Sequence, residues 1–334
     1  MQLAVLNPGG RDREQHFPQF AGAPADPAPH PPVNYHAYAA CTGGTFYRDP
    51  ARIPSDWRAV LLVLRRDLKA CLKALRQLKA DGKIVAVSLK ESGLHQVAKL
   101  FGDAEKIALF REICALADGC LSSTQDLAGV YRAAGGRHAG FIPTPYPVDS
   151  EKWDFSLPLD QRAGIFIGTR EWDTPSRNHA AALLLAASLG APVTVVNEEG
   201  AAGRKRIAAA GLVNAQIIEG RLPYADYLRL VARHRIVLQL DRSAVPGQVA
   251  GDALLCGVPC VGGDGAIERI AFAETCGFGR DAAALGELAE RLLNNDAAYQ
   301  GAISQSRTAA AERLSFPAIA KTLEDYFTGL AARS

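Results

Sequence analysis

Residues Ile236–Phe272 read IVLQLDRSAVPGQVAGDALLCGVPCVGGDGAIERIAF and indicate the fold more clearly than any other part of the chain. This stretch starts as an apolar strand, turns at Val245-Pro246-Gly247, continues as a helix of small residues, and returns to a strand that ends in Gly262-Gly263-Asp264-Gly265. This order is typical of an open parallel sheet, whose ligand crevice lies at the carboxyl ends of the strands. Because backbone amides at the start of a helix bind phosphate oxygens, the stretch predicts a phosphate site beside Gly247 and Gly265.

The segment from Asp252 to Gly262, DALLCGVPCVG, resembles the donor half-site of GT-B glycosyltransferases, most closely that of glycosyltransferase family 4. In that family two glutamates at a fixed spacing flank the glycine turn. Here the second position is Asp252 and the first is Ala244. The resemblance implies that Asp252 accepts hydroxyl groups of a nucleotide ribose, whereas Ala244 lacks the carboxylate that holds the donor sugar in the family. The alternative is a Rossmann-like half without a ligand.

Length and composition fit a two-domain enzyme. A chain of 334 residues is long for one core, and 48% hydrophobic with 22% charged residues favours a compact soluble protein over a disordered one. The chain has no apolar run of about 18 residues and no basic flank before an apolar core, so we expect neither a membrane span nor a signal peptide, and a cytoplasmic protein. Seven scattered cysteines without a Cys-x-x-Cys pair favour reduced thiols, and we expect no metal.

The resemblance is continuous from Asp118 to the carboxyl end and covers only the layout before that. It implies an α/β fold with GT-B architecture, in which two Rossmann-like domains face each other across a cleft. We expect an acceptor domain at residues 1–150, a nucleotide-sugar donor domain at 151–315, and a terminal helix at 316–334 that crosses back to the first domain. The boundary is expected between Pro147 and Pro158.

A second donor motif follows the strand expected at 164–167. Gly168 and Arg170 resemble the turn that neutralises the donor diphosphate in family 4, and Arg177 takes the place of a lysine. Arginine binds phosphate bidentately, so this exchange preserves the chemistry, although both arginines could also be surface residues without a ligand. Glu219 to Leu222 match the segment that borders the nucleobase. The residues assigned to a UDP- or GDP-sugar donor, with no separate cofactor, are Gly168, Arg170, Arg177, Glu219, Gly247, Gln248, Asp252 and Gly265.

The amino-terminal half offers polar residues after its inferred strands. A Gly-Gly turn follows the strand at 2–6, and in GT-B proteins such a turn lines the cleft. Lys90 and Glu91 follow the strand at 84–89, so they should face the same crevice, unless Glu91 or Ser92 caps the next helix. His36 lies in an aromatic segment after a long proline-rich loop (residues 18–32), where it serves either packing or acceptor binding. The acceptor candidates are Gly10, Arg11 and Lys90, and the catalytic candidates are Asp12, His36 and Glu91.

The acceptor is the least determined part of the prediction. Residues 1–150 carry a formal charge of +4 and the remainder −2, and Lys69, Lys73, Arg76 and Lys79 share one helix face. Such a face is either a solvated surface or a contact for a polyanion. The resemblance to family 4 implies transfer, with retention, to a saccharide or lipid-linked saccharide, which is the first hypothesis. The alternatives are a phage-type enzyme acting on hydroxymethylated pyrimidines in double-stranded DNA and an inactive nucleotide-binding protein. The sequence leaves the oligomeric state open.

Overall fold

The computed structural model describes residues 1–65 and 67–333 and divides into two compact units. Unit 1 comprises Met1–Lys152 and Leu314–Ser334, and unit 2 comprises Trp153–Arg313. The division after Lys152 falls within the stretch between Pro147 and Pro158. Within the described ranges, no helix combines the length and the apolar character needed to cross a membrane.

Unit 1 is built on one mixed sheet with the strand order β2-β3-β1-β4-β5-β6-β7. All neighbouring strands are parallel except β2 and β3, which are antiparallel. The apolar runs of β4 and β5 are buried along their whole length, as expected for strands covered on both faces. The strands are β1 (Ala4–Leu6), β2 (Gln15–His16), β3 (Thr45–Tyr47), β4 (Ala59–Leu64), β5 (Ile84–Leu89), β6 (Gly119–Ser122) and β7 (Ala139–Phe141).

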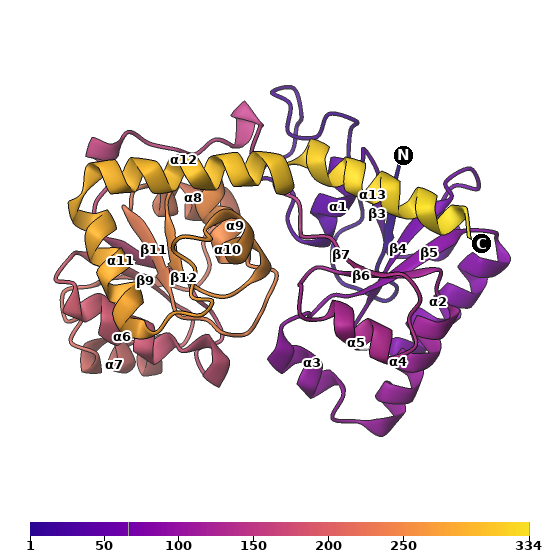
Figure 1. The fold of residues 1–334 in the computed structure, drawn as a ribbon, viewed down its shortest axis with the longest axis horizontal. Coiled ribbons are helices and arrows are strands. Elements are labelled where there is room, and N and C mark those ends of the chain that lie inside the picture. The colour runs from indigo at the N-terminus through magenta and orange to yellow at the C-terminus, as the bar shows by residue number, and fades with distance from the viewer. Residues whose placement is uncertain (66, 334) are drawn as a thin grey trace. The chain divides into compact units, whose positions relative to one another are not determined.

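Alternating residues of these strands form two separate cores. Val60, Leu62 and Leu64 pack with α2, α4 and α5, whereas Leu61 and Val63 pack with α1 and α13. Figure 1 shows these helices on either side of the sheet. The period of two along each strand therefore produces a three-layer unit. Its helices are α1 (Tyr35–Cys41), α2 (Leu68–Ala80), α3 (Leu94–Leu100), α4 (Ala104–Leu116), α5 (Ala128–Ala133) and α13 (Phe316–Ala331), with a 3-10 turn at Pro50–Arg52.

Unit 2 is built on a parallel sheet with the strand order β10-β9-β8-β11-β12. The order reverses between β8 and β11, which makes the carboxyl ends of these strands the topological switch point. Its strands are β8 (Ile165–Ile167), β9 (Val193–Asn197), β10 (Gln216–Glu219), β11 (Ile236–Gln239) and β12 (Cys260–Gly262). Its helices are α6 (His179–Ser188), α7 (Gly200–Ala209), α8 (Tyr224–Ala232), α9 (Gln248–Leu255), α10 (Ala266–Ala271), α11 (Ala282–Asn294) and α12 (Asp296–Arg313), with 3-10 turns at Glu151–Trp153, Leu159–Gln161 and Pro175–Arg177.

The proline-rich loop contains no helix, as predicted. Its turns are held by Asp26, whose carboxylate accepts the amides of Gly22 (2.8 Å) and Ala28 (2.9 Å). The loop is also anchored to the segment that leaves unit 1, because Ser150 donates to the carbonyl of Gly22 and Lys152 donates to that of Asp26.

Candidate functional site

Two sets of loops, one at each sheet, carry most of the assigned residues. The unit 2 edge is formed by the loops after β8, β9, β11 and β12 (residues 168–178, 198–199, 240–247 and 263–265). The unit 1 edge is formed by the loops after β1, β4 and β5 (residues 7–14, 65 and 90–93) together with the start of α1. Parallel strands bring the loops of each set together at one edge of their sheet.

Gly168 and Arg170 lie at the switch point, beside Asp252. A Cβ atom on Gly168 would lie 2.7 Å from a ring carbon of Phe166 and 2.8 Å from the hydroxyl of Tyr227, so the close approach requires glycine. The Arg170 side chain is 48% exposed, and its Nε lies 3.5 Å from Glu198 Oε1 at the end of β9. Arg170 therefore presents a guanidinium group at the opening of the unit 2 edge.

Asp252 is a buried carboxyl group in the middle of α9. Tyr224, the first residue of α8, donates its hydroxyl hydrogen to Asp252 Oδ1. Burial raises the pKa of Asp252 to about 7, against the opposing effects of the Tyr224 hydrogen bond and the charge of Arg170. The fold thus brings Asp252 into one cluster with Gly168 and Arg170, from which it is distant in sequence.

Arg177 is held by two carboxylates of the unit 2 edge. Its guanidinium donates to Asp241 and to Glu171 Oε2 (2.9 Å), and only 16% of its side chain is exposed. Burial opposes the charge, but these two carboxylates outweigh it and raise the pKa of Arg177. The contact of Arg177 with a diphosphate stays a prediction, and it requires the ligand to share the guanidinium with Asp241.

The two glycine turns within Ile236–Phe272 differ in what their backbone amides contact. Gly247 is the N-cap residue of α9, with φ 95°, and no side chain caps that helix. The amides that open α10 are already bonded, because those of Ala266 and Ile267 donate to the carbonyls of Val245 (2.9 Å) and Pro246 (3.2 Å). The turn at Gly247 is therefore the better candidate for a phosphate, whereas the turn at Gly265 holds the neighbouring loop.

Glu219 and Gln248 complete the residues assigned to the donor. Glu219, at the end of β10, accepts hydrogen bonds from Arg204 (2.7 Å) and Asn197 (3.0 Å). The hydrogen bond from Arg204 is the main cause of the lowered pKa of Glu219. Gln248 is the first residue of α9 and is partly exposed. Both assignments stay predictions.

The unit 1 edge gathers Gly10, Asp12 and Lys90. A Cβ atom on Gly10 would overlap the Asn7 side chain, whose Nδ2 donates to Asp12 Oδ2 (3.1 Å). Lys90 Nζ also donates to Asp12 Oδ2. Burial raises the pKa of Asp12, but the hydrogen bond and charge of Lys90 outweigh it, so the net pKa is lowered and the carboxyl group is ionised at neutral pH.

His36 and Glu91 are the other two catalytic candidates. His36 Nε2 lies 2.8 Å from the carbonyl oxygen of Arg13, so this nitrogen carries the proton and Nδ1 is left as an acceptor. Burial is the main cause of the lowered pKa of His36, which is therefore neutral at pH 7. Glu91 accepts from Arg65 Nε (2.9 Å) and Ser92 bonds to Ser123 (2.9 Å), so neither of them caps α3, whose N-cap is Gly93.

Arg65 is a residue of this edge that the sequence analysis missed. It follows β4 directly, pairs with Glu91, and its charge lowers the pKa of Asp12. The rule that pointed to Lys90 and Glu91, position at the end of a parallel strand, would have found it. Arg11, the remaining acceptor candidate, is exposed in the loop after β1.

The basic face of α2 is largely neutralised within unit 1. Lys69 pairs with Glu105 of α4 (2.7 Å). Arg76 pairs with Glu112 of the same helix, and Lys79 pairs with Asp118. Three of the four aligned cations thus contact carboxylates. A face paired in this way attracts a polyanion far less than the sequence pattern indicates.

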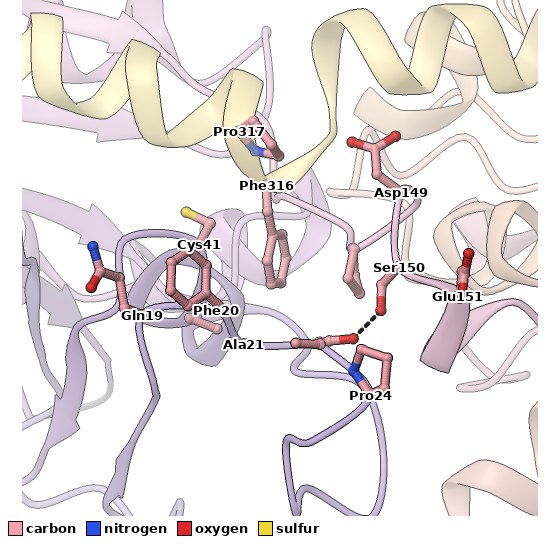
Figure 2. Close-up of a pocket in the computed structure, with 14 residues that line it drawn as sticks. Gln19, Phe20, Ala21, Pro24, Cys41, Asp149, Ser150, Glu151, Phe316 and Pro317 are labelled. Carbon is pink, nitrogen blue, oxygen red and sulfur yellow. Dashed lines mark hydrogen bonds between the residues drawn. The ribbon is translucent and has the colours of Figure 1, made fainter.

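A cavity of about 460 Å³ lies in unit 1, away from the strand ends. Its walls come from the proline-rich loop, the end of α1, the segment at residues 147–151 and the start of α13. Figure 2 shows Ser150 pointing toward the proline-rich loop and Phe316 of α13 beside the cavity. None of the assigned donor or acceptor residues lines it.

Comparison with solved structures decides the fold. The chain superposes on a UDP-forming α,α-trehalose-phosphate synthase from Burkholderia xenovorans with a TM-score of 0.65, over 99% of both chains, at 12% sequence identity. The chain has the GT-B fold. The trehalose 6-phosphate synthase of Burkholderia multivorans gives a TM-score of 0.63 at 11% identity, over 99% of this chain and 97% of that one.

The GT-B protein HepE from Anabaena, in complex with UDP and glucose, gives a TM-score of 0.61 at 13% identity, over 80% of this chain and 78% of that one. Neither a family model nor a curated protein matches the sequence. At these identities the likeness is one of fold, which by itself leaves the reaction open. The expectation of an α/β GT-B fold is confirmed, and the comparisons do not single out family 4.

Proposed function

We propose that this chain is a glycosyltransferase that moves a sugar from a nucleotide-sugar to a hydroxyl group of an acceptor. The observation that carries the proposal is the cluster of Gly168, Arg170 and Asp252 at the switch point of a GT-B sheet, beside the uncapped start of α9. Ligands of open α/β sheets bind at this place. HepE holds UDP and the Burkholderia xenovorans synthase is UDP-forming, which favours a UDP-sugar as the donor.

The cluster suits the charges that develop during the reaction. As the glycosidic phosphate bond breaks, positive charge grows on the sugar and negative charge on the departing diphosphate. Arg170 and the first amides of α9 stabilise that negative charge. Asp252 accepts a ribose hydroxyl, which anchors the nucleoside next to them. Arg177 adds to this stabilisation if its guanidinium group contacts the diphosphate and Asp241 together.

The unit 1 edge is proposed to hold the acceptor. Asp12 is ionised but bound by Lys90, and Glu91 is bound by Arg65, so neither carboxylate is as available for a proton as the neutral His36 ring. If transfer retains the anomeric configuration, the leaving phosphate takes the acceptor proton. In that case these side chains orient the hydroxyl group.

A saccharide is the acceptor class that the electrostatics favour. Because Lys69, Arg76 and Lys79 are paired with carboxylates, the helix face that would track a DNA backbone is nearly neutral. Double-stranded DNA is therefore the second candidate, carried only by the exposed Arg11 and Arg13 of the loop after β1. The inactive alternative keeps the donor site without transfer.

Thermal unfolding with a panel of nucleotides and nucleotide-sugars tests the proposal. We expect UDP and one UDP-sugar to raise Tm, because a ligand present at about 100 times its Kd adds about 2.7 kcal/mol of stability. Slow release of UDP from that sugar, accelerated by a saccharide, would establish transfer. A shift in Tm without any release of UDP would favour the inactive binder. No shift with any nucleotide would contradict the proposal.

A further inference from the structure

Glu268, on α10, is a buried carboxyl group with an unused oxygen. The residue is 1% exposed. Its Oε1 accepts a hydrogen bond from Nε2 of Gln239, the last residue of β11, at 2.7 Å. Its Oε2 is buried and has no hydrogen-bond partner among the described residues. Burying a polar oxygen without a partner costs free energy, which indicates that Glu268 has a role at this position.

Both glycine turns of the unit 2 edge rest on this carboxyl group. A Cβ atom on Gly247 or on Gly265 would overlap Oε2 of Glu268. A Cβ atom on Gly263 would lie 2.9 Å from Oε1 and 2.8 Å from Nε2 of Gln239. The three glycines therefore let the backbone of two separate loops close over one side chain.

Backbone contacts tie the same loops to α10. Val245 and Pro246 accept the first amides of that helix, and the amide of Ala244 donates to Asp264 Oδ1 at 3.1 Å. These bonds fix the loop that leads into α9 against α10. The Glu268 carboxyl group lies close against Gly247. A change in the size of the Glu268 side chain should shift the first turn of α9. A change in its charge should alter the binding of an anion there.

We propose that Glu268 is a positioning residue for the donor diphosphate: its buried side chain supports Gly247 and keeps the first backbone amides of α9 in the position that binds phosphate. The inference rests on the proposed function, because it assumes that a nucleotide diphosphate binds at α9. Glu268 touches neither the sugar nor the reacting atoms, and it acts through the backbone of the loop.

The surroundings of Glu268 favour the uncharged form. The pKa of Glu268 is raised to about 8, mainly by burial, with a smaller contribution from the negative charges of Asp241 and Asp264. Arg177 pairs with Asp241, and Arg269 lies 3.7 Å from Asp264, so both nearby cations are engaged by those carboxylates. The thiol of Cys260 on β12 is the other titratable neighbour, and its pKa is raised well above its ordinary value.

Helices α9 and α12 both pack against α10, and α9 carries Asp252, whose pKa is raised to about 7 mainly by burial. The buried residues of α12, which packs against α10, are Tyr299, Ser306 and Ala310. Ionisation of Glu268 would therefore place an uncompensated negative charge beneath a bound diphosphate, and the like charges would repel. The affinity of this loop for a diphosphate should therefore depend on the protonation of Glu268.

The test is the affinity for UDP of the full chain between pH 6 and pH 9, measured by calorimetry. We expect the Kd of the wild type to rise about tenfold between pH 7 and pH 9, because only the protonated form binds well. Glu268→Gln keeps the shape and the hydrogen bond from Gln239 but cannot ionise, so its Kd should stay flat above pH 8. Glu274→Gln, which removes an exposed carboxylate a few positions further along the chain, is the control and should follow the wild type.

A second variant covers a failure of Glu268→Gln to fold. Gln239→Leu removes the hydrogen bond that lowers the pKa of Glu268, so the fall in affinity should begin at a higher pH. Equal pH profiles for the wild type and Glu268→Gln, or an unmoved profile in Gln239→Leu, would overturn the positioning role. Absence of UDP binding by the wild type at every pH would instead overturn the proposed function.

Discussion

At the scale of single residues, the two arginines assigned to the diphosphate do different work. Arg170 is about half exposed and makes only a long contact with Glu198, whereas Arg177 is mostly buried and paired with Asp241 and Glu171. An exposed pair contributes little to stability, and a buried pair is costly to break. We therefore expect Arg170 to affect ligand binding and Arg177 to affect both binding and folding.

Replacing Arg170 by alanine should weaken binding of UDP by about 1.5 to 3 kcal/mol, the range for hydrogen bonds to charged groups. The free energy of unfolding should hardly change. Arg229→Ala is the control, because Arg229 forms an exposed pair with Asp226 on α8 (2.8 Å) and has no assigned role. Calorimetric titration compares the two variants, and equal losses in both would remove Arg170 from the site.

Replacing Arg177 by alanine leaves the buried carboxylate of Asp241 without its cation. Loss of one partner of a buried pair costs about 3 to 5 kcal/mol, so unit 2 should unfold at a lower denaturant concentration. Arg206→Ala breaks the exposed pair with Asp173 and should change the free energy of unfolding by about 0 to 1 kcal/mol. Urea titration of both variants checks this, and a stable Arg177→Ala would show that Asp241 finds another partner.

Asp252 should recognise the ribose through its carboxyl group. Wild-type protein should prefer UDP over 2′-deoxy-UDP, and Asp252→Asn should lose much of that preference. Competition binding with the two nucleotides makes the comparison. A variant that discriminates as well as the wild type would reduce Asp252 to a structural residue of α9.

The same residue gives a stability prediction with a defined sign. Burial raises the pKa of Asp252 from an ordinary value of 3.8 to about 7. Its contribution is therefore complete below about pH 4 and is lost as the pH rises through 7, with a slope of up to about 1.4 kcal/mol per pH unit. Asp252→Asn should flatten the dependence of the unfolding free energy over this window. An equally steep slope in the variant would assign the effect to Glu268 instead.

At the scale of elements, the sequence predicted what hydrophobic periodicity encodes. The apolar runs of β4 and β5 and the amphipathic pattern of α2, capped by Asp67, were recognisable without any tertiary information. The helix α1 was not, because most of its residues are buried and no side chain caps it. Helices α3 and α4 are separated at Phe101–Asp103, where the Asp103 side chain caps the second helix.

The candidate site was predictable only in part, for a related reason. Residues that follow a strand, such as Arg170 and Lys90, can be placed at a sheet edge from the chain order alone. The salt bridges of α2 and the contact of Glu268 with Gly247 join segments that the linear pattern does not relate. Partners across elements therefore became visible only in the fold.

The pairing of α2 makes an element-scale prediction about nucleic acid. Because its cations are matched by Glu105, Glu112 and Asp118, binding to hydroxymethylated duplex DNA should be weak and should change little between about 50 and 200 mM salt. Each phosphate contact would add about −0.9 to the slope of log K against log salt. A steep slope would instead make DNA the favoured class of acceptor.

At the scale of the whole molecule, the chain has a GT-B fold, and its proposed donor site lies on unit 2. The likeness to the Burkholderia synthases covers 99% of this chain, while the identity of 11 to 12% leaves the side chains of the site to be argued from this sequence. That argument rests on Arg170, Asp252 and the first turn of α9. The acceptor is supported more weakly, by the cluster around Asp12 and Lys90.

The most direct test is the position of UDP in a crystal structure of the full chain grown with saturating nucleotide. We expect diphosphate oxygens within about 2.7 to 3.2 Å of the Arg170 guanidinium and of amides in the first turn of α9. We also expect a ribose hydroxyl at the Asp252 carboxyl group. UDP bound elsewhere, for example in the cavity of unit 1, or no UDP at all, would contradict this expectation.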